Sequence, residues 1–162
     1  MDVLDEELLK FWQALNNYGV QYIMVGGFAV NMHGYSRATN DIDVWIKDDK
    51  INRKNFGKAL EQFGYGDSSW EELQFVPGWT DFYIGPGIRL DVLTTMKGIE
   101  DITFEQAFEQ ATIAKIEKIP VPFLHINQLI QNKKAVNRPK DQIDVLELEK
   151  IKQLRKEMGL DQ

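Results

Sequence analysis

The chain has 162 residues, no cysteine, a net charge of −6 and a pI near 5.0. This length supports one domain with a substantial core, and a hydrophobic fraction of 43% is ordinary for a globular protein. The lack of cysteine excludes disulfides and thiolate metal sites, and the acidic balance argues against a broad nucleic-acid-binding surface. Because the sequence shows neither a secretory signal nor a long apolar run, we expect a cytoplasmic protein that does not enter a membrane.

The first predicted elements are a helix, a buried strand and a second helix. Apolar residues from Leu4 to Leu15 recur at helical spacing, and Gly19 is placed to end this helix. Residues 20–25 form a short apolar run that is typical of a buried strand and stops at Gly26-Gly27. Phe28 to His33 then has a helical pattern, so we expect a strand to pass into a helix through two glycines.

A second strand and a helix follow. Residues 41–46 alternate polar with apolar at the start, which predicts a strand with Ile42, Val44 and Ile46 on its core face. Apolar positions between Phe56 and Phe63 then predict a helix.

The middle of the chain returns to strands. Tyr83-Ile84 and Ile88 to Leu93 read as strands, and Gly85-Pro86-Gly87 between them is a strong hairpin signal. Thr103 with Gln106 fits a capping box that opens another helix.

The last third of the chain is predicted to be helical. Leu124 to Val136 and Asp141 to Met158 carry apolar residues at helical spacing, with Arg138-Pro139 as the break between them. We therefore expect one domain over residues 1–162 of α/β (α+β) class: a mixed sheet over about 20–95, flanked by helices, and a helical C-terminal part over about 103–158.

Two acidic residues stand on a strand that otherwise has core character. Asp41 and Asp43 are two residues apart, so their carboxylates leave the sheet on the same face. At about 5 Å and an effective dielectric of about 20, two such charges repel by roughly 3 kcal/mol, so a cation is expected beside them. Asp91 has the same alternation on a later strand, and the three carboxylates converge if the two strands are neighbours.

Three converging carboxylates suit a hard divalent cation. Mg²⁺ prefers oxygen ligands and is commonly completed by substrate phosphates. The alternative is a surface strand whose acids are solvated or paired with Arg37 or Arg89. The third strand acid and the upstream glycine pair favour the metal hypothesis.

The glycine pair is a candidate phosphate cradle. Gly26 and Gly27 lie where a strand passes into a helix, and unpaired N–H groups and the helix dipole favour an anion at such a place. The loop that leads on to Asp41 adds Arg37 and Thr39. A plain tight turn is the alternative at this position.

A dense basic cluster precedes the last predicted helix. Lys133, Lys134, Arg138 and Lys140 are candidates to hold a triphosphate or an acceptor phosphate, and a solvated helix face is the alternative. The next residues, Asp141 and Asp144, have a simple explanation as acids that compensate a helix dipole.

The remaining distinctive residues favour structural roles. His33 and His125 are isolated, which argues against catalysis. The aromatic cluster is expected to form core or a subunit interface rather than a base-stacking surface; it comprises Trp70, Phe75, Trp79, Phe82 and Tyr83.

Two blocks of the sequence together resemble a known enzyme superfamily. Residues 25–44 (VGGFAVNMHGYSRATNDIDV), followed by Asp91, closely resemble the signature of the DNA polymerase β-like nucleotidyltransferase superfamily, especially its small bacterial AbiEii-toxin-like and minimal branch. Residues 132–144 (NKKAVNRPKDQID) are similar to the C-terminal motif of that branch. The two blocks agree in order and spacing over most of the chain.

The resemblance implies transfer of a nucleoside monophosphate from a triphosphate (NTP) to an acceptor hydroxyl, with two Mg²⁺ ions and release of pyrophosphate. It assigns Asp41 and Asp43 to the metal, and Asp91 to the second metal and to orienting or deprotonating the acceptor. Gly26 and Gly27 would hold the triphosphate. Many relatives carry serine at the position of Gly27, which here offers only its backbone donor.

The sequence therefore predicts a metal-dependent nucleotidyltransferase with Mg²⁺, or Mn²⁺ in its place, and an NTP as substrate. The acceptor is open between a tRNA end, a protein and a small molecule, and a cognate partner protein or a homo-oligomer is possible. The first alternative is a catalytically silent nucleotide-binding or toxin-antitoxin partner protein of the same fold. The second is a glycosyltransferase-like Asp-x-Asp site, which the short chain and the upstream glycine pair disfavour.

Overall fold

The fold is a mixed six-stranded sheet with the strand order β3-β4-β2-β1-β6-β5. The computed structural model describes residues 5–66, 70–75 and 82–160. β1 pairs antiparallel with β2 and parallel with β6. β2 also pairs with β4, and these two strands are parallel. The strands are β1 (Tyr22–Val25), β2 (Asp41–Ile46), β3 (Phe82–Tyr83), β4 (Arg89–Leu93), β5 (Thr112–Ile116) and β6 (Ile119–Phe123).

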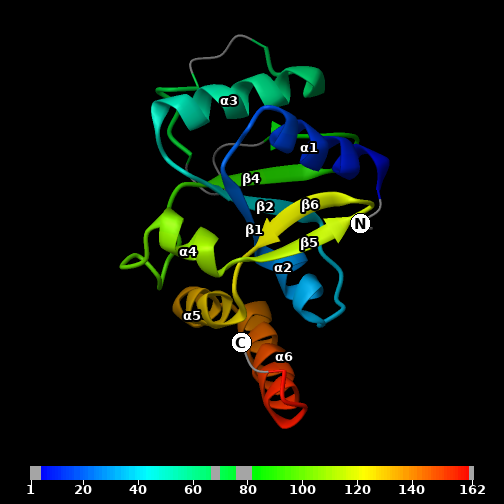
Figure 1. Ribbon diagram of the computed structural model, residues 1–162, viewed down its shortest axis with the longest axis vertical. Helices are drawn as coiled ribbons and strands as arrows, with labels where there is room; N and C mark the ends of the chain where they lie inside the picture. The colour runs from blue at the N-terminus through cyan, green and yellow to red at the C-terminus, as the bar shows by residue number, and fades with distance from the viewer. Residues whose placement is uncertain (1–4, 67–69, 76–81, 161–162) are drawn as a thin grey trace.

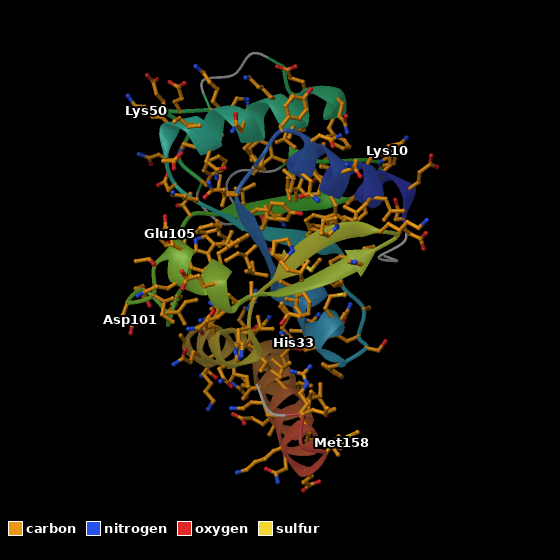
Figure 2. All side chains as sticks on the ribbon, in the orientation of Figure 1. Lys10, His33, Lys50, Asp101, Glu105 and Met158 are labelled. Atoms are coloured by element: carbon orange, nitrogen blue, oxygen red, sulfur yellow. The ribbon has the colours of Figure 1, made fainter. Side chains whose placement is uncertain are left out.

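Helices cover both faces of this sheet (Figure 1). α1 and α3 pack together on one side, while α2, α5 and α6 pack on the other. The far end of α6 extends away from the sheet, and Figure 2 shows the exposed side chain of Met158 there. The helices are α1 (Glu6–Asn17), α2 (Gly26–His33), α3 (Lys50–Leu60), the 3₁₀ helix η1 (Glu61–Phe63), α4 (Phe104–Gln110), α5 (Ile126–Val136) and α6 (Pro139–Glu157).

The alternation in β2 separates a core face from a polar face. Ile42, Val44 and Ile46 are fully buried, as predicted. Asp41 and Asp43 point to the opposite face, because successive side chains of a strand alternate. This arrangement places the two acids on the side of the sheet that α2, α5 and α6 cover.

Several local predictions are confirmed. Gly85–Gly87 lie in the turn between β3 and β4, where the amide of Ile84 donates to the carbonyl of Ile88 at 3.0 Å. Thr103 and Gln106 form the expected capping box of α4. The fold class, α+β with a mixed sheet flanked by helices, is confirmed as well.

The predicted helical C-terminal part over about 103–158 contains α4, α5 and α6, but it also contains two strands that the sequence did not predict. β5 and β6 form a hairpin that adds two strands to the sheet beyond β1. Its turn residues Glu117 and Lys118 have φ values of 48° and 69°, a conformation usually marked by glycine or asparagine. Pro139 also begins α6 rather than standing outside it, because the first helical position needs no N–H donor.

The aromatic cluster is mainly core. Trp70 and Phe75 pack edge-to-face on Phe56, with ring centroids 5.6 and 6.2 Å apart, and Phe82 is buried with them. Tyr83 is 49% exposed, and Trp79 lies outside the described residues.

Within the described ranges, none of the helices has the length and apolar character that crossing a bilayer requires.

Candidate active site

The three predicted carboxylates share one face of two neighbouring strands. The parallel register of β2 and β4 sets Asp43 opposite Asp91 and Asp41 opposite Arg89. Neighbouring strands lie about 4.8 Å apart. The structure therefore confirms that the strands of Asp41, Asp43 and Asp91 are neighbours and places the three residues on one face of the sheet.

Asp43 lies in an unfavourable electrostatic position. Burial raises the pKa of its carboxyl to about 7, and the charges of Asp91 and Asp41 push it in the same direction. Lys133 and Lys140 act in the opposite direction. Burial and like charge thus outweigh the nearby cations.

Arg89 stands beside the other two carboxylates. Its guanidinium lies 4.0 Å from Asp41 Oδ2 and 3.5 Å from Asp91 Oδ1. Pairing with Arg89, the alternative considered for these acids, is thus present for Asp41 and Asp91. Among the described residues, no three acidic or histidine side chains are gathered closely enough to hold a metal ion as they stand.

The donor set nevertheless suits a divalent cation. Three carboxylates on one face supply the hard oxygen ligands that Mg²⁺ and Mn²⁺ take. The raised pKa of Asp43 shows that burial and the neighbouring acids leave its negative charge undercompensated. A bound cation would relieve this repulsion, so Asp41, Asp43 and Asp91 remain the predicted ligands.

We call Asp41, Asp43 and Asp91 the acidic row. The two glycines leave no space between α2 and the acidic row for a larger residue. Gly26 has φ +69°, and a Cβ atom at this position would overlap the carboxylate of Asp43. A Cβ atom at Gly27 would lie 2.7 Å from Thr39 Oγ1 and 3.3 Å from a guanidinium nitrogen of Arg37. The first turn of α2, with its unpaired N–H groups, therefore faces Asp43 directly.

Arg37 is held beside this turn by a buried carboxylate. Its Nε and Nη2 donate to the two oxygens of Asp144 at 2.7 and 2.9 Å, and the side chain of Asp144 is fully buried. Thr39 Oγ1 donates to the carbonyl of Asp41 at 3.2 Å. Arg37 and Thr39 thus line the turn as predicted, but Arg37 is already engaged in a bidentate ion pair.

The predicted basic cluster divides into buried and exposed parts. Lys133 is 4% exposed, and its ammonium lies 3.2 Å from Asp141 and 3.1 Å from Asp144. Arg138 also pairs with Asp141, at 2.7 Å, whereas Lys140 is exposed. A solvated helix face therefore fails to describe this cluster, because one of its members is a core cation.

Asp141 and Asp144 do more than compensate a helix dipole. Burial alone would raise the pKa of Asp141, but hydrogen bonds from Arg138 and Lys133 outweigh it and lower the pKa to about 2. Both carboxylates are fully buried, and together they connect Lys133, Arg138 and Arg37. We call these five residues the ion network.

The ion network faces the acidic row. Lys133 and Lys140 both lower the pKa of Asp43. Hydrogen bonding to Asp141 raises the pKa of Arg138, and the charge of Asp43 adds to this effect. Two parts of the chain about 100 residues apart thus meet across one polar site.

Neither histidine belongs to the site. Burial lowers the pKa of His33 to about 4, and its Nε2 lies 2.7 Å from the carbonyl of Leu124. His125 caps α5 by accepting from the amide of Asn127. Both therefore have structural roles.

Sequence reasoning missed two features of the site. The pairing of Arg37 with Asp144 spans 107 residues and has no local signal. The burial of Asp141 and Asp144 did have a signal, because their spacing with Leu148 marks the buried side of α6.

Comparison with known proteins identifies the family. A sequence model of the family described as "Nucleotidyl transferase of unknown function (DUF2204)" matches residues 5–162. The chain belongs to this family. It is a nucleotidyltransferase, consistent with the polymerase β-like superfamily that the sequence resembles. No curated protein matches the sequence.

Solved structures of other nucleotidyltransferases share the fold. The lincosamide antibiotic adenylyltransferase LnuA, bound to lincomycin, has a TM-score of 0.61 and 16% identity, with 91% of this chain and 97% of that chain covered. ANT(2")-Ia in complex with adenylyl-2"-tobramycin has a TM-score of 0.56 and 20% identity, with 91% and 92% covered. An antigenic nucleotidyltransferase-like protein from Paracoccidioides brasiliensis has a TM-score of 0.56 and 15% identity, with 91% and 75% covered.

The ion network gives a first prediction. Asp144→Asn removes the charge that two buried or half-buried cations share, so the free energy of unfolding should fall by about 3–5 kcal/mol. Urea denaturation measures this loss. The control is Glu149→Gln on the exposed side of the same helix, where the pair with Lys134 is solvated and removal should change stability by less than about 0.5 kcal/mol. Equal effects of the two substitutions would contradict a structural role for the network.

The raised pKa of Asp43 gives a second prediction. The folded protein binds a proton here that the unfolded chain, with an ordinary pKa of 3.8, has lost, so this group lowers stability as the pH rises from about 4 to about 7. Asp43→Asn lacks this penalty. In buffer with a chelator, its melting temperature should exceed that of the wild type by several degrees at pH 8 and by little at pH 4. Parallel pH profiles would show that Asp43 is not perturbed.

The glycine turn gives a third prediction. Gly26→Ala adds a Cβ atom that collides with the Asp43 carboxylate in a backbone conformation that alanine disfavours, so stability should fall by about 1–3 kcal/mol. Gly66→Ala is the matched control, since no atom lies within 4 Å of its added Cβ. An unchanged melting temperature of Gly26→Ala would show that the turn and Asp43 are not in close contact.

Proposed function

We propose that this nucleotidyltransferase moves a nucleoside monophosphate from an NTP to an acceptor hydroxyl and releases pyrophosphate. One observation carries the proposal: Asp43 lies opposite Asp91 on adjacent parallel strands and directly against the glycine turn that opens α2. A carboxylate row next to an anion-binding helix start is the arrangement that a metal-bound triphosphate requires.

Asp41, Asp43 and Asp91 would hold two Mg²⁺ ions, or Mn²⁺ in their place. When bound, these cations neutralise charge on the transferred group and on the attacking and leaving oxygens. The protein contributes carboxylates whose backbone positions are fixed by strand pairing, so only their side chains would have to move when the cations arrive.

The triphosphate would lie at the start of α2. The backbone N–H groups of Gly26 and Gly27 donate toward it, and the absence of side chains lets a phosphate approach the helix end. Thr39 Oγ1 and the guanidinium of Arg37 border the same turn. Lys140, Arg138 and Lys133 add positive potential from the other side of the site.

In the transfer step, the acceptor oxygen attacks the α-phosphorus while the bond from that phosphorus to the bridging oxygen of the leaving pyrophosphate breaks. The proton of the acceptor hydroxyl passes to the carboxylate of Asp91, which is the outermost of the three acidic strand positions toward β3. The bonding electrons leave with pyrophosphate, whose charge the cationic groups around the glycine turn stabilise. Positioning and electrostatics therefore account for most of the catalysis.

A small hydroxyl compound is the acceptor class with most support. LnuA and ANT(2")-Ia are, by their descriptions, an antibiotic adenylyltransferase and a protein bound to adenylyl-2"-tobramycin, and they share this fold. The net charge of −6 also disfavours a long polyanionic acceptor. We propose ATP as donor and a cytoplasmic location. A tRNA end, a protein acceptor, a toxin-antitoxin role and a partner protein or homo-oligomer are the competing hypotheses.

Transfer can be tested with nucleotides labelled at the α-phosphate. The pure protein is incubated with each labelled NTP, with Mg²⁺ or Mn²⁺, and with separate pools of small hydroxyl compounds, tRNA and protein; the small-molecule pool includes tobramycin and lincomycin. Label should move to one pool only when the divalent cation is present. Asp43→Asn should lower the rate at least about 100-fold.

The control for this assay is Asp101→Asn, which removes an exposed acid remote from β2 and β4 (Figure 2). It should leave the rate unchanged. If no pool takes label while ATP with Mg²⁺ raises the melting temperature, the silent nucleotide-binding alternative is correct; saturation at 100 times the Kd stabilises by about 2.7 kcal/mol. Full activity of Asp43→Asn would remove Asp43 from the site.

A further inference from the structure

Tyr83 is an exposed aromatic residue on the same face of the sheet as the acidic row. Its direct partner in the antiparallel pair of β3 and β4 is Arg89, which is in turn the direct partner of Asp41 on β2. Direct partners on neighbouring strands share a face, so Tyr83, Arg89 and Asp41 form one line across three strands. Phe82, one residue earlier, points to the opposite face and is buried in the core.

The backbone that carries the Tyr83 side chain is held by three contacts. The amide of Tyr83 donates to the hydroxyl oxygen of Tyr65 at 2.7 Å. The next amide, of Ile84, donates to the carbonyl of Ile88 at 3.0 Å and closes the turn to β4. The ring of Phe82 packs edge-to-face on the ring of Tyr65, with centroids 5.3 Å apart. The fold therefore fixes this position while the Tyr83 side chain faces outward.

The Tyr83 ring contributes little to the packing of the protein itself. It is 49% exposed, although a tyrosine ring is a large apolar surface. The aromatic pairs made by β3 centre on Phe82, and within the described residues none of them includes the Tyr83 ring. An aromatic side chain that is exposed beside a row of functional groups suits contact with a ligand.

Tyr83 and Asp91 are close enough for one small molecule to contact both. Asp91 follows Arg89 by two residues on β4, so it is the diagonal neighbour of Tyr83 on the same face. Diagonal neighbours of this kind lie about 7–8 Å apart. This separation is comparable to the width of one six-membered ring with its substituents. An acceptor whose hydroxyl reaches Asp91 therefore has the rest of its ring near Tyr83.

The direction of the transfer also favours this end of the site for the acceptor. α2, whose first turn is the proposed triphosphate cradle, lies against β1 and β2 and faces Asp43. Tyr83 lies at the other end of the site, on the edge strand β3. Phosphoryl-type transfer needs the attacking and the leaving oxygens roughly in line, on opposite sides of the phosphorus. An acceptor held at Tyr83 attacks from the side opposite the glycine turn.

We propose that Tyr83 is an acceptor-binding residue and that the acceptor is a small hydroxylated ring compound. One face of the acceptor ring lies on the Tyr83 ring while one of its hydroxyls reaches Asp91. Tyrosine supplies this contact area at a low cost in conformational entropy, because its side chain has only two torsions. An open-chain polyol has no flat face and loses the contact. This inference rests on the proposed transferase function and names the acceptor class within it.

Steady-state kinetics separate acceptor binding from nucleotide binding. Transfer from ATP labelled at the α-phosphate is measured with tobramycin, lincomycin and myo-inositol as single acceptors. Tyr83→Val keeps a residue that favours strands but removes the ring, so the KM of the acceptor that takes label should rise about five- to twentyfold with kcat within about twofold. Tyr83→Phe retains the ring and should restore the KM of the wild type. Isothermal titration should give all three proteins the same Kd for ATP with Mg²⁺.

Binding without turnover gives a second measurement. Myo-inositol and sorbitol have the same numbers of carbons and hydroxyls, but only myo-inositol is a ring. In saturation-transfer difference NMR, with Mg²⁺ and an ATP analogue that cannot transfer its α-phosphate, saturation of the protein's aromatic protons should reach myo-inositol, tobramycin or lincomycin more strongly than sorbitol. The signal should be lost in Tyr83→Val and kept in Tyr83→Phe. Near-ultraviolet circular dichroism checks that each variant is folded.

The matched control is Tyr18→Val, because Tyr18 is 45% exposed and lies at the end of α1, on the other side of the sheet. It should change neither the acceptor KM nor the NMR signal. An unchanged acceptor KM in Tyr83→Val, or binding of sorbitol as strong as that of the ring compounds, overturns the inference and leaves the transferase function intact.

The remaining outcomes separate the inference from the function on which it rests. Transfer of label to tRNA that is lost in Tyr83→Val would assign the ring to base stacking and overturn the ring-compound acceptor. A wild type that binds none of the three ring compounds overturns the inference, whichever pool takes label. Absence of transfer to every pool overturns the proposed function itself.

Discussion

Repulsion among three carboxylates on one face of a sheet is the constraint that organises this molecule. Strand pairing sets Asp43 opposite Asp91, and the pleat carries Asp41 to the same side, so the backbone alone imposes the juxtaposition. Two charges at about 5 Å repel by roughly 3 kcal/mol at an effective dielectric of about 20. The fold tolerates this because cations approach from several directions: Lys133 and Lys140 act on Asp43, and Arg89 contacts the other two acids.

These cations are of two kinds, and burial separates them. Lys133 and Arg37 are tied to Asp141 and Asp144, whose side chains are fully buried, and breaking a pair of that kind leaves an uncompensated charge in the interior. The ion network therefore joins α5 and α6 to the glycine turn of α2 as a permanent part of the structure. The side chain of Arg89 is 30% exposed and Lys140 is exposed, so solvent reaches both of them.

Local sequence patterns predicted the strands and turns that side-chain alternation and turn residues determine. Alternation in Asp41–Ile46 marked both the core face and the acidic face of β2, and the glycine-rich turn before Arg89 marked the β3–β4 hairpin. The β5–β6 hairpin had no such mark, because Glu117 and Lys118 adopt positive φ without a glycine or asparagine, and prolines at positions 120 and 122 suggest a break. β6 accommodates these two prolines because it pairs with β1 at Phe123, which follows both of them, so the N–H groups that the prolines lack are not needed for that pairing.

The candidate site shows the same division between local and distant information. Spacing in the sequence was enough to predict which residues lie together on one strand or in one turn, and these residues include the carboxylates and the two glycines. The partners of the basic residues could not be predicted in this way, since Arg37 and its partner Asp144 are 107 residues apart in the sequence. A cluster of lysines and arginines in the sequence therefore reads as one uniform cationic patch, whereas packing makes Lys133 a core residue and leaves Lys140 exposed. The chemistry follows from that difference: buried cations hold the shape of the site, and exposed ones remain available to the charged substrate.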